Sequence, residues 1–263
     1  MNVLFIGDIV GKIGRDIVYS MIEKITSENA IDFIIANGEN ATHGKGLTEA
    51  HFNELLDSGI DVITLGNHYA AKKEIFNYLD TYENILRPQN LHKSIPGVGT
   101  NVYDCNGVKI RVTNLLGRVY MSLDVDNPFD ALNDIVENDD SDIHIVDFHA
   151  EATGEKYALA CGFDGRVSAV LGTHTHVQTR DYRILSNGTA YISDVGRCGP
   201  YDSILGVKKE DVVTRTWTGT PTVFEVKEDG SGLFSACLLS FDDKTYKCIN
   251  IRPIYMVLDE GEY

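Results

Sequence analysis

Apolar runs and helical patterns alternate along most of the chain. Residues 2–6 form a nearly continuous apolar run, which is typical of a strand buried on both faces. In residues 15–28, apolar side chains recur at helical spacing and predict a helix. The same order continues with predicted strands at 31–36, 60–65, 143–148 and 167–171, and with predicted helices from Thr48 to Asp57, at 72–79, at 129–136 and at 155–161. Strands that alternate with helices in this way predict an α/β fold.

The pattern changes between residues 97 and 116, where two β-like runs flank Asn106-Gly107. An Asn-Gly pair between such runs is a strong hairpin signal. Beyond the last predicted βα unit the chain is expected to be mostly antiparallel, with turns at Asn187-Gly188 and Asp229-Gly230, strands around Val223, Leu233 and Ile249, and one late helix at 208–217. No repeat or linker divides the chain, so a single domain is predicted over residues 1–263.

Composition and charge narrow the classes of protein to consider. With 263 residues and 43% hydrophobic content, the chain is long enough to bury a core. No apolar run approaches the roughly 20 residues that span a bilayer, so no membrane partner is expected. The net charge of −16 argues against long nucleic acid as a partner, because non-specific binding to nucleic acid needs a basic surface. Five widely spaced cysteines favour reduced thiols and a cytoplasmic location.

Candidate chemistry stands directly after the predicted strands. His174 and His176 follow the apolar run 167–171, and two residues at this spacing do not share a helix face. They are therefore expected where the backbone turns at a strand end, which is the edge where α/β sheets build ligand sites. Five strand ends supply side chains that can bind a metal, namely Asp8, Glu39, Asn40, Asn67, His149, His174 and His176. Each residue alone has a structural explanation, but five strand ends together predict a metal centre.

The number of candidate ligands favours two metal ions. Two carboxylates, two amides and three histidines are too many for one ion that keeps an open position. They suit two ions about 3.5–4 Å apart that share a carboxylate, and Glu39 is the predicted bridge. Two divalent ions with Asp8, Glu39 and one hydroxide would leave a charge of about +1, which attracts phosphate despite the acidic protein. Oxygen and nitrogen ligands without thiolate fit manganese, iron or zinc.

The expected reaction is hydrolysis of a phosphate ester. A hydroxide that bridges the two ions would attack phosphorus in line, while the ions stabilise charge on the phosphoryl oxygens. His68 comes directly after Asn67 and is the predicted catalytic proton donor to the leaving oxygen. The alternative for His68 is a histidine that only orients a metal ligand.

The motifs around these residues resemble those of a known family. Gly7-Asp8, Gly66-Asn67-His68 and the segment 172–176 resemble the signature blocks of calcineurin-like metallophosphoesterases. More closely, the chain is similar to the bacterial YmdB-like subfamily in five segments, namely Gly7 to Gly11, Asn37 to Ala41, His149 to Thr153, Gly172 to Thr179 and Gly199 to Asp202. The similarity runs through essentially the whole chain.

The resemblance implies a fold, an activity and roles for single residues. It implies a two-sheet β-sandwich flanked by helices in four αββα layers, and a phosphodiesterase acting on small cyclic nucleotides, in particular 2′,3′-cyclic monophosphates. The cofactors would be two divalent or mixed-valence ions, iron or manganese, with zinc as the alternative. Homo-oligomers and a role in regulating gene expression are also implied. By matching position, one ion would be held by Asp8, Glu39, Asn40 and His176, and the other by Glu39, Asn67, His149 and His174, with His68 as proton donor.

Two departures from the family pattern leave alternatives open. Ile9 and Val10 occupy the stretch where the wider superfamily has a metal-binding histidine, and Asn40 takes its place in the subfamily pattern. The subfamily commonly has Thr-Trp-Asp where this chain has Tyr69-Ala70-Ala71, so the wall of the substrate pocket is altered. The alternatives are a phosphomonoesterase, an RNA-directed nuclease, or a regulatory protein that binds a metal or nucleotide with little turnover.

Overall fold

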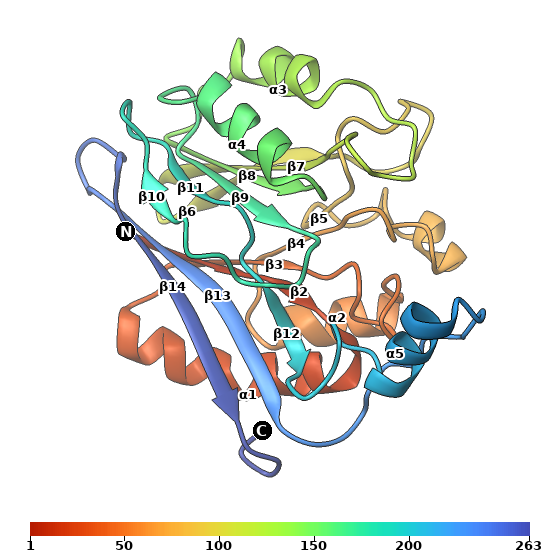
Figure 1. Ribbon diagram of the computed structural model, residues 1–263. Coiled ribbons are helices and arrows are strands. Elements are labelled where there is room, and N and C mark those ends of the chain that lie inside the picture. Colours follow the sequence, from red (N-terminus) through yellow and green to blue (C-terminus); the bar gives the residue numbers. More distant parts are fainter.

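The computed structural model describes residues 1–263, and two β-sheets lie face to face in it (Figure 1). The first sheet contains β1 (Asn2–Ile6), β2 (Asp8–Ile9), β3 (Phe33–Asn37), β4 (Val62–Thr64), β5 (Ile85–Leu86), β12 (Arg197–Pro200), β13 (Gly232–Phe241) and β14 (Cys248–Leu258). The second contains β6 (Thr100–Cys105), β7 (Val108–Leu116), β8 (Ile143–His149), β9 (Ala169–Thr173), β10 (Arg183–Ile184) and β11 (Ala190–Ile192). The helices are α1 (Gly11–Asn29), α2 (Glu49–Asp57), α3 (Pro128–Val136), α4 (Thr153–Gly162), α5 (Lys209–Thr218) and the 3-10 helix η1 (Lys73–Asn77).

Strand β1 shows how the apolar pattern produces the layers. Its side chains alternate between two faces, as in any strand. Leu4 and Ile6 pack with the apolar faces of α1 and α2, whereas Val3 and Phe5 enter the core shared with the second sheet. Helices α3 and α4 cover the outer face of the second sheet (Figure 1). The predicted α/β architecture of two sheets flanked by helices is therefore confirmed.

The parallel strands bring their carboxyl ends to one edge of each sheet. In the first sheet β1, β3 and β4 run parallel. In the second sheet β7, β8 and β9 run parallel, and their residues Leu116, His149 and Thr173 lie level with one another. The side chain of Asn37 at the end of β3 reaches Asp147 on β8, with 2.9 Å between Nδ2 and Oδ2. The ends of both sets of strands therefore meet.

Several local predictions need correction. Helix α1 begins at Gly11, four residues before the predicted start at 15. The prediction starts too late because Gly11 and Gly14 are poor helix formers, so the first turn does not have the composition of a helix. The stretch predicted as a helix at 72–79 is the short 3-10 helix η1. The predicted strand around Val223 is wrong, since this residue lies in a segment without regular secondary structure and is 81% exposed. None of the helices has the length and apolar content required to cross a membrane.

The close approach of β9 to the segment after β11 requires a glycine at position 172. A Cβ built on Gly172 would lie 1.8 Å from the carbonyl oxygen of Ser193, which is fixed backbone. We expect Gly172→Ala to lower the free energy of unfolding by about 1–3 kcal/mol, measured by urea denaturation. The matched control is Gly154→Ala on α4, where a Cβ would meet nothing within 4 Å and the helix should gain up to about 1 kcal/mol. Equal stability of the two variants would contradict the packing described for β9.

Candidate metal centre

The seven predicted ligand residues gather where the strand ends of both sheets meet. Asp8 begins β2 directly after β1, and Glu39 and Asn40 lie in the turn after β3. Asn67 lies in the turn after β4, His149 is the last residue of β8, and both His174 and His176 follow β9. The contacts among their side chains form two groups, which are joined by Nδ1 of His149 at 3.8 Å from Oδ1 of Asp8.

The first group surrounds one nitrogen atom of His149. Nε2 of this ring lies 2.9 Å from Oδ1 of Asn67, 3.1 Å from Oε1 of Glu39 and 3.1 Å from Nδ1 of His174. A ring nitrogen has a single proton or a single lone pair, so it can serve only one of these three atoms well. Glu39, His149 and His174 each offer a ligand atom, and these atoms lie within 4.8 Å of one another. Such convergence fits a cation better than a set of hydrogen bonds.

The second group surrounds the carboxylate of Asp8, which is fully buried. Its Oδ2 accepts a hydrogen bond of 3.1 Å from the backbone nitrogen of His174, but its Oδ1 has no hydrogen-bond partner. Nε2 of His176 lies 3.8 Å from this Oδ1 and 3.3 Å from Oδ1 of Asn40. A buried carboxylate oxygen without a donor is costly, and a bound cation would satisfy it. The residues of both groups therefore fit metal ions.

Burial and neighbouring charges shift the pKa values of the ionisable groups in this cluster. Burial raises the pKa of Asp8 well above its usual value. Burial also acts to raise the pKa of Glu39, but the charge of His149 and its hydrogen bond outweigh burial and hold this pKa at about 2. Burial acts to lower the pKa of His149, and the charge of Glu39 reverses this to raise it to about 9. Burial and then the charge of His149 lower the pKa of His174 to about 3. One positive charge is thus held among the carboxylates, in a place that suits a cation.

His68 lies at the rim of the same centre. Its backbone nitrogen donates a hydrogen bond of 2.7 Å to Oε2 of Glu39, which ties the turn after β4 to the turn after β3. The side chain is half-buried, and burial lowers its pKa. The imidazole lies next to the first group of ligands, a position from which a proton can be exchanged with a bound substrate.

A buried ion pair supports the loop that carries both later histidines. His174 and His176 have φ angles of 101° and 63°, and residues other than glycine rarely adopt such positive φ angles. The carboxylate of Asp194 accepts hydrogen bonds from the backbone and the hydroxyl of Thr175, at 2.9 and 2.8 Å. Nζ of Lys156 lies 2.9 Å from this carboxylate and donates to the carbonyl of Thr173 at 2.8 Å. These two residues were missed in the sequence, although Asp194 also follows an apolar run.

Loss of Lys156 should destabilise the protein strongly. Its side chain and that of Asp194 are 0% and 1% exposed, so Lys156→Met leaves a buried carboxylate without its countercharge. We expect the free energy of unfolding of the metal-free protein to fall by about 3–5 kcal/mol in urea denaturation. Lys24→Met, at an exposed position of α1, is the matched control and should change stability little. A loss below about 1 kcal/mol for Lys156→Met would show that the pair does not hold the loop.

Arg197 also supports this loop. Its guanidinium donates to the carbonyl of His176 at 3.1 Å and to the carbonyl of Pro200 at 3.0 Å. The turn that follows brings the carbonyl of Leu205 within 3.0 Å of Nδ1 of His176. This contact leaves Nε2 of His176 to face Asn40 and Asp8. The segment from Gly199 to Asp202, which resembles the subfamily pattern, therefore comprises the end of β12 and the start of the turn that supports His176.

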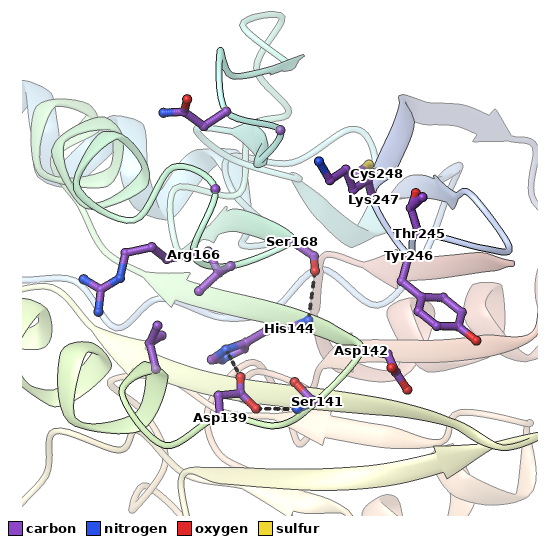
Figure 2. Close-up of a pocket in the computed structure, with 15 residues that line it drawn as sticks. Asp139, Ser141, Asp142, His144, Arg166, Ser168, Thr245, Tyr246, Lys247 and Cys248 are labelled. Carbon is purple, nitrogen blue, oxygen red and sulfur yellow. Dashed lines mark hydrogen bonds and ion pairs between the residues drawn. The ribbon is translucent and has the colours of Figure 1, made fainter.

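A separate pocket of about 230 Å³ lies at the opposite end of β8 (Figure 2). It is lined by His144 near the start of β8 and by the turn between β13 and β14. Its one largely buried acidic group is already paired, since Asp139 lies 2.7 Å from Nδ1 of His144, as Figure 2 shows, and 2.8 Å from Nε of Arg111 outside the pocket lining. The converging ligand atoms of the metal centre have no counterpart in this pocket.

Comparison with known proteins identifies the family. Residues 4–254 match the sequence profile of the family described as YmdB-like protein. The chain belongs to the YmdB-like protein family. The resemblance noted in its motifs is therefore confirmed. This YmdB-like chain is 46% identical over 256 residues to a Bacillus subtilis (strain 168) protein named 2′,3′-cyclic-nucleotide 2′-phosphodiesterase, with 97% of this chain and 96% of that protein covered.

Two solved structures are similar to this YmdB-like chain along its length. A hypothetical protein from Thermus thermophilus is 39% identical with a TM-score of 0.92, and 98% of this chain and 100% of that chain are covered. A protein from Mycoplasma pneumoniae, described as a novel phosphatase, is 39% identical with a TM-score of 0.94, and 100% of this chain and 95% of that chain are covered. The fold of this chain is thus shared with its relatives.

Proposed function

We propose that this YmdB-like protein is a dimetal phosphodiesterase that hydrolyses small cyclic nucleotides, with 2′,3′-cyclic monophosphates as substrates. The observation that carries this proposal is the convergence of three ligand atoms on Nε2 of His149, next to the unpartnered carboxylate oxygen of Asp8. The identity of 46% to a 2′,3′-cyclic-nucleotide 2′-phosphodiesterase supports the choice of substrate. The predicted enzyme class, a phosphoric diester hydrolase, is confirmed by this relationship.

The two contact groups suggest how the ligands divide. Asp8, Asn40 and His176 would hold one ion, because Nε2 of His176 faces oxygen atoms of the other two. Asn67, His149 and His174 would hold the second ion. Oδ1 of Asn67 and Nδ1 of His174 both lie close to Nε2 of His149. Glu39 would bridge the ions. Its carboxylate contacts His149 and belongs to the cluster with His174. The absence of thiolate ligands fits iron or manganese, with zinc as the alternative.

The protein groups around the centre fit hydrolysis of a phosphodiester. When bound, two divalent ions supply a water nucleophile of lowered pKa and offset the charge of the phosphoryl group. His68 would donate a proton to the leaving ribose oxygen, since it lies at the rim of the centre and is tied to Glu39. The carboxylates of Asp8 and Glu39 carry fewer negative charges than two divalent ions carry positive ones, so the site attracts a phosphate. The net charge of −16 still disfavours long nucleic acid.

One assay distinguishes the proposed function from the alternatives. Metal-reconstituted protein should hydrolyse 2′,3′-cyclic AMP faster than a linear diester, bis-p-nitrophenyl phosphate, or a monoester, AMP. Chelation by EDTA should abolish the activity, and manganese should restore it. Faster hydrolysis of AMP would favour a phosphomonoesterase. No turnover of any substrate by the fully metallated protein would favour a regulatory binding protein. A cytoplasmic location, homo-oligomers and a role in gene regulation stay predictions.

A further inference from the structure

Asp147 is a buried carboxylate that the proposed chemistry does not use. It lies two residues before His149 on β8 and is fully buried. Its Oδ1 accepts a hydrogen bond of 2.7 Å from the hydroxyl of Thr173. Its Oδ2 accepts one of 2.5 Å from the hydroxyl of Thr64 and one of 2.9 Å from Nδ2 of Asn37. Since Asn37 and Thr64 belong to the first sheet and Thr173 to the second, both sheets hold this carboxylate in place.

The hydroxyl of Thr173 connects this carboxylate to a predicted metal ligand. Its Oγ1 lies 2.9 Å from Nδ1 of His149 as well as 2.7 Å from Asp147. A hydroxyl has one proton, and a carboxylate can only accept, so this proton points to Asp147. The contact with His149 must then be a hydrogen bond that Nδ1–H of the ring donates. A neutral His149 therefore has its proton on Nδ1 and its lone pair on Nε2.

The orientation of this lone pair is what a metal ligand requires. Nε2 of His149 is the atom that faces Asn67, Glu39 and His174. In the other tautomer, Nε2 would carry a proton and could not bind a metal. The second nitrogen of a metal-binding histidine usually donates to an acceptor that fixes the tautomer and the ring orientation. Here that acceptor is a hydroxyl whose own proton is directed by a buried carboxylate.

We propose that Asp147 and Thr173 are positioning residues that select the metal-binding tautomer of His149 through the path Asp147–Thr173–His149. This inference rests on the proposed function, because it treats His149 as a metal ligand. It assigns a role to residues that are not metal ligands. Asn37 and Thr64 donate hydrogen bonds to Oδ2 of Asp147, which leaves Oδ1 to accept the hydrogen bond from Thr173. The prediction is specific to one of the two ions, the one bound by His149.

Thr173→Val removes the hydroxyl while nearly conserving the shape of the side chain. We expect zinc titration to show two ions in the wild-type protein and an affinity at one site weakened about 10–100-fold in this variant, with the other site unchanged. Thr173→Ser keeps a hydroxyl and should restore the affinity. Asp147→Asn presents an amide N–H to Thr173, turns the hydroxyl proton toward His149, and should weaken the same site. Nitrogen-15 NMR of the zinc-loaded proteins should show His149 bound through Nε2 in the wild type and in Thr173→Ser.

The matched control is Thr26→Val, which also removes a buried hydroxyl, one that has no hydrogen-bond partner in the protein. It should leave both zinc affinities unchanged. Wild-type zinc affinity at both sites in Thr173→Val and Asp147→Asn would overturn the inference and leave the proposed function standing. A wild-type protein that binds no zinc and no manganese would contradict the proposed function and the inference together. Urea denaturation of the metal-free variants establishes that each is folded before titration.

Discussion

Replacing Glu39 with Gln is expected to reduce kcat/KM for 2′,3′-cyclic AMP by at least about 10³-fold, because a negative charge in the bridging role proposed for Glu39 would be worth several kcal/mol. The carboxylate of Glu39 lies 3.1 Å from Nε2 of His149 and accepts the backbone N–H of His68 at 2.7 Å. Gln has nearly the same shape but no charge to share between two cations. The variant should therefore also bind fewer metal ions per chain, which elemental analysis after reconstitution measures.

Glu23→Gln is the matched control for this experiment. Glu23 lies on α1 and is exposed, so its replacement should leave both activity and metal content unchanged. If Glu39→Gln kept two ions and wild-type activity, Glu39 would not bridge them, and the proposed arrangement of ligands would be wrong. Because the residue is buried, the urea denaturation curve of the metal-free variant should be recorded beside the kinetics.

His68→Ala is expected to slow hydrolysis of 2′,3′-cyclic AMP by about 10²–10⁴-fold while both metal ions remain bound. The leaving group of this substrate is a ribose alkoxide, which needs a proton. The p-nitrophenolate that leaves bis-p-nitrophenyl phosphate is stable without a proton, so its release should slow much less. The comparison of the two substrates therefore separates loss of proton donation from general damage to the site.

His92→Ala replaces an exposed histidine whose Nδ1 lies 2.8 Å from Oγ of Ser94, and it should have no effect on either substrate. Two results would contradict the role proposed for His68. Loss of metal from His68→Ala would make it a ligand or a residue that orients one. Equal slowing of both substrates would show that His68 does not act on the leaving group.

The local elements of the fold followed from the sequence where the apolar pattern was continuous. β1, β8 and β9 are buried on both faces, so they lie close to the predicted ranges, and Thr48 caps α2 as predicted. The pairing of distant segments did not follow. β13, near the C-terminus, pairs with β1 in the middle of the first sheet, and no local pattern specifies such a partner.

The candidate site was predictable to the same extent. The candidate ligands could be recognised in the sequence because they are polar residues directly after buried strands, and α/β sheets build their ligand sites at these strand ends. The residues that support them, such as Lys156 and Asp147, lie within a helix and within a strand, and their partners are far away in the chain. Asp147, for example, contacts Asn37 from 110 positions away. Such contacts depend on how the two sheets are stacked, and the sequence alone does not reveal the stacking.

The separation of His174 and His176 onto different metal ions is the central claim about this centre. Anomalous diffraction from crystals of the manganese-loaded protein tests it most directly. We expect two peaks about 3.5–4 Å apart with Glu39 between them. One peak should lie at His176, Asp8 and Asn40, and the other at His174, His149 and Asn67. A single peak, or two peaks with both histidines on the same ion, would contradict this separation.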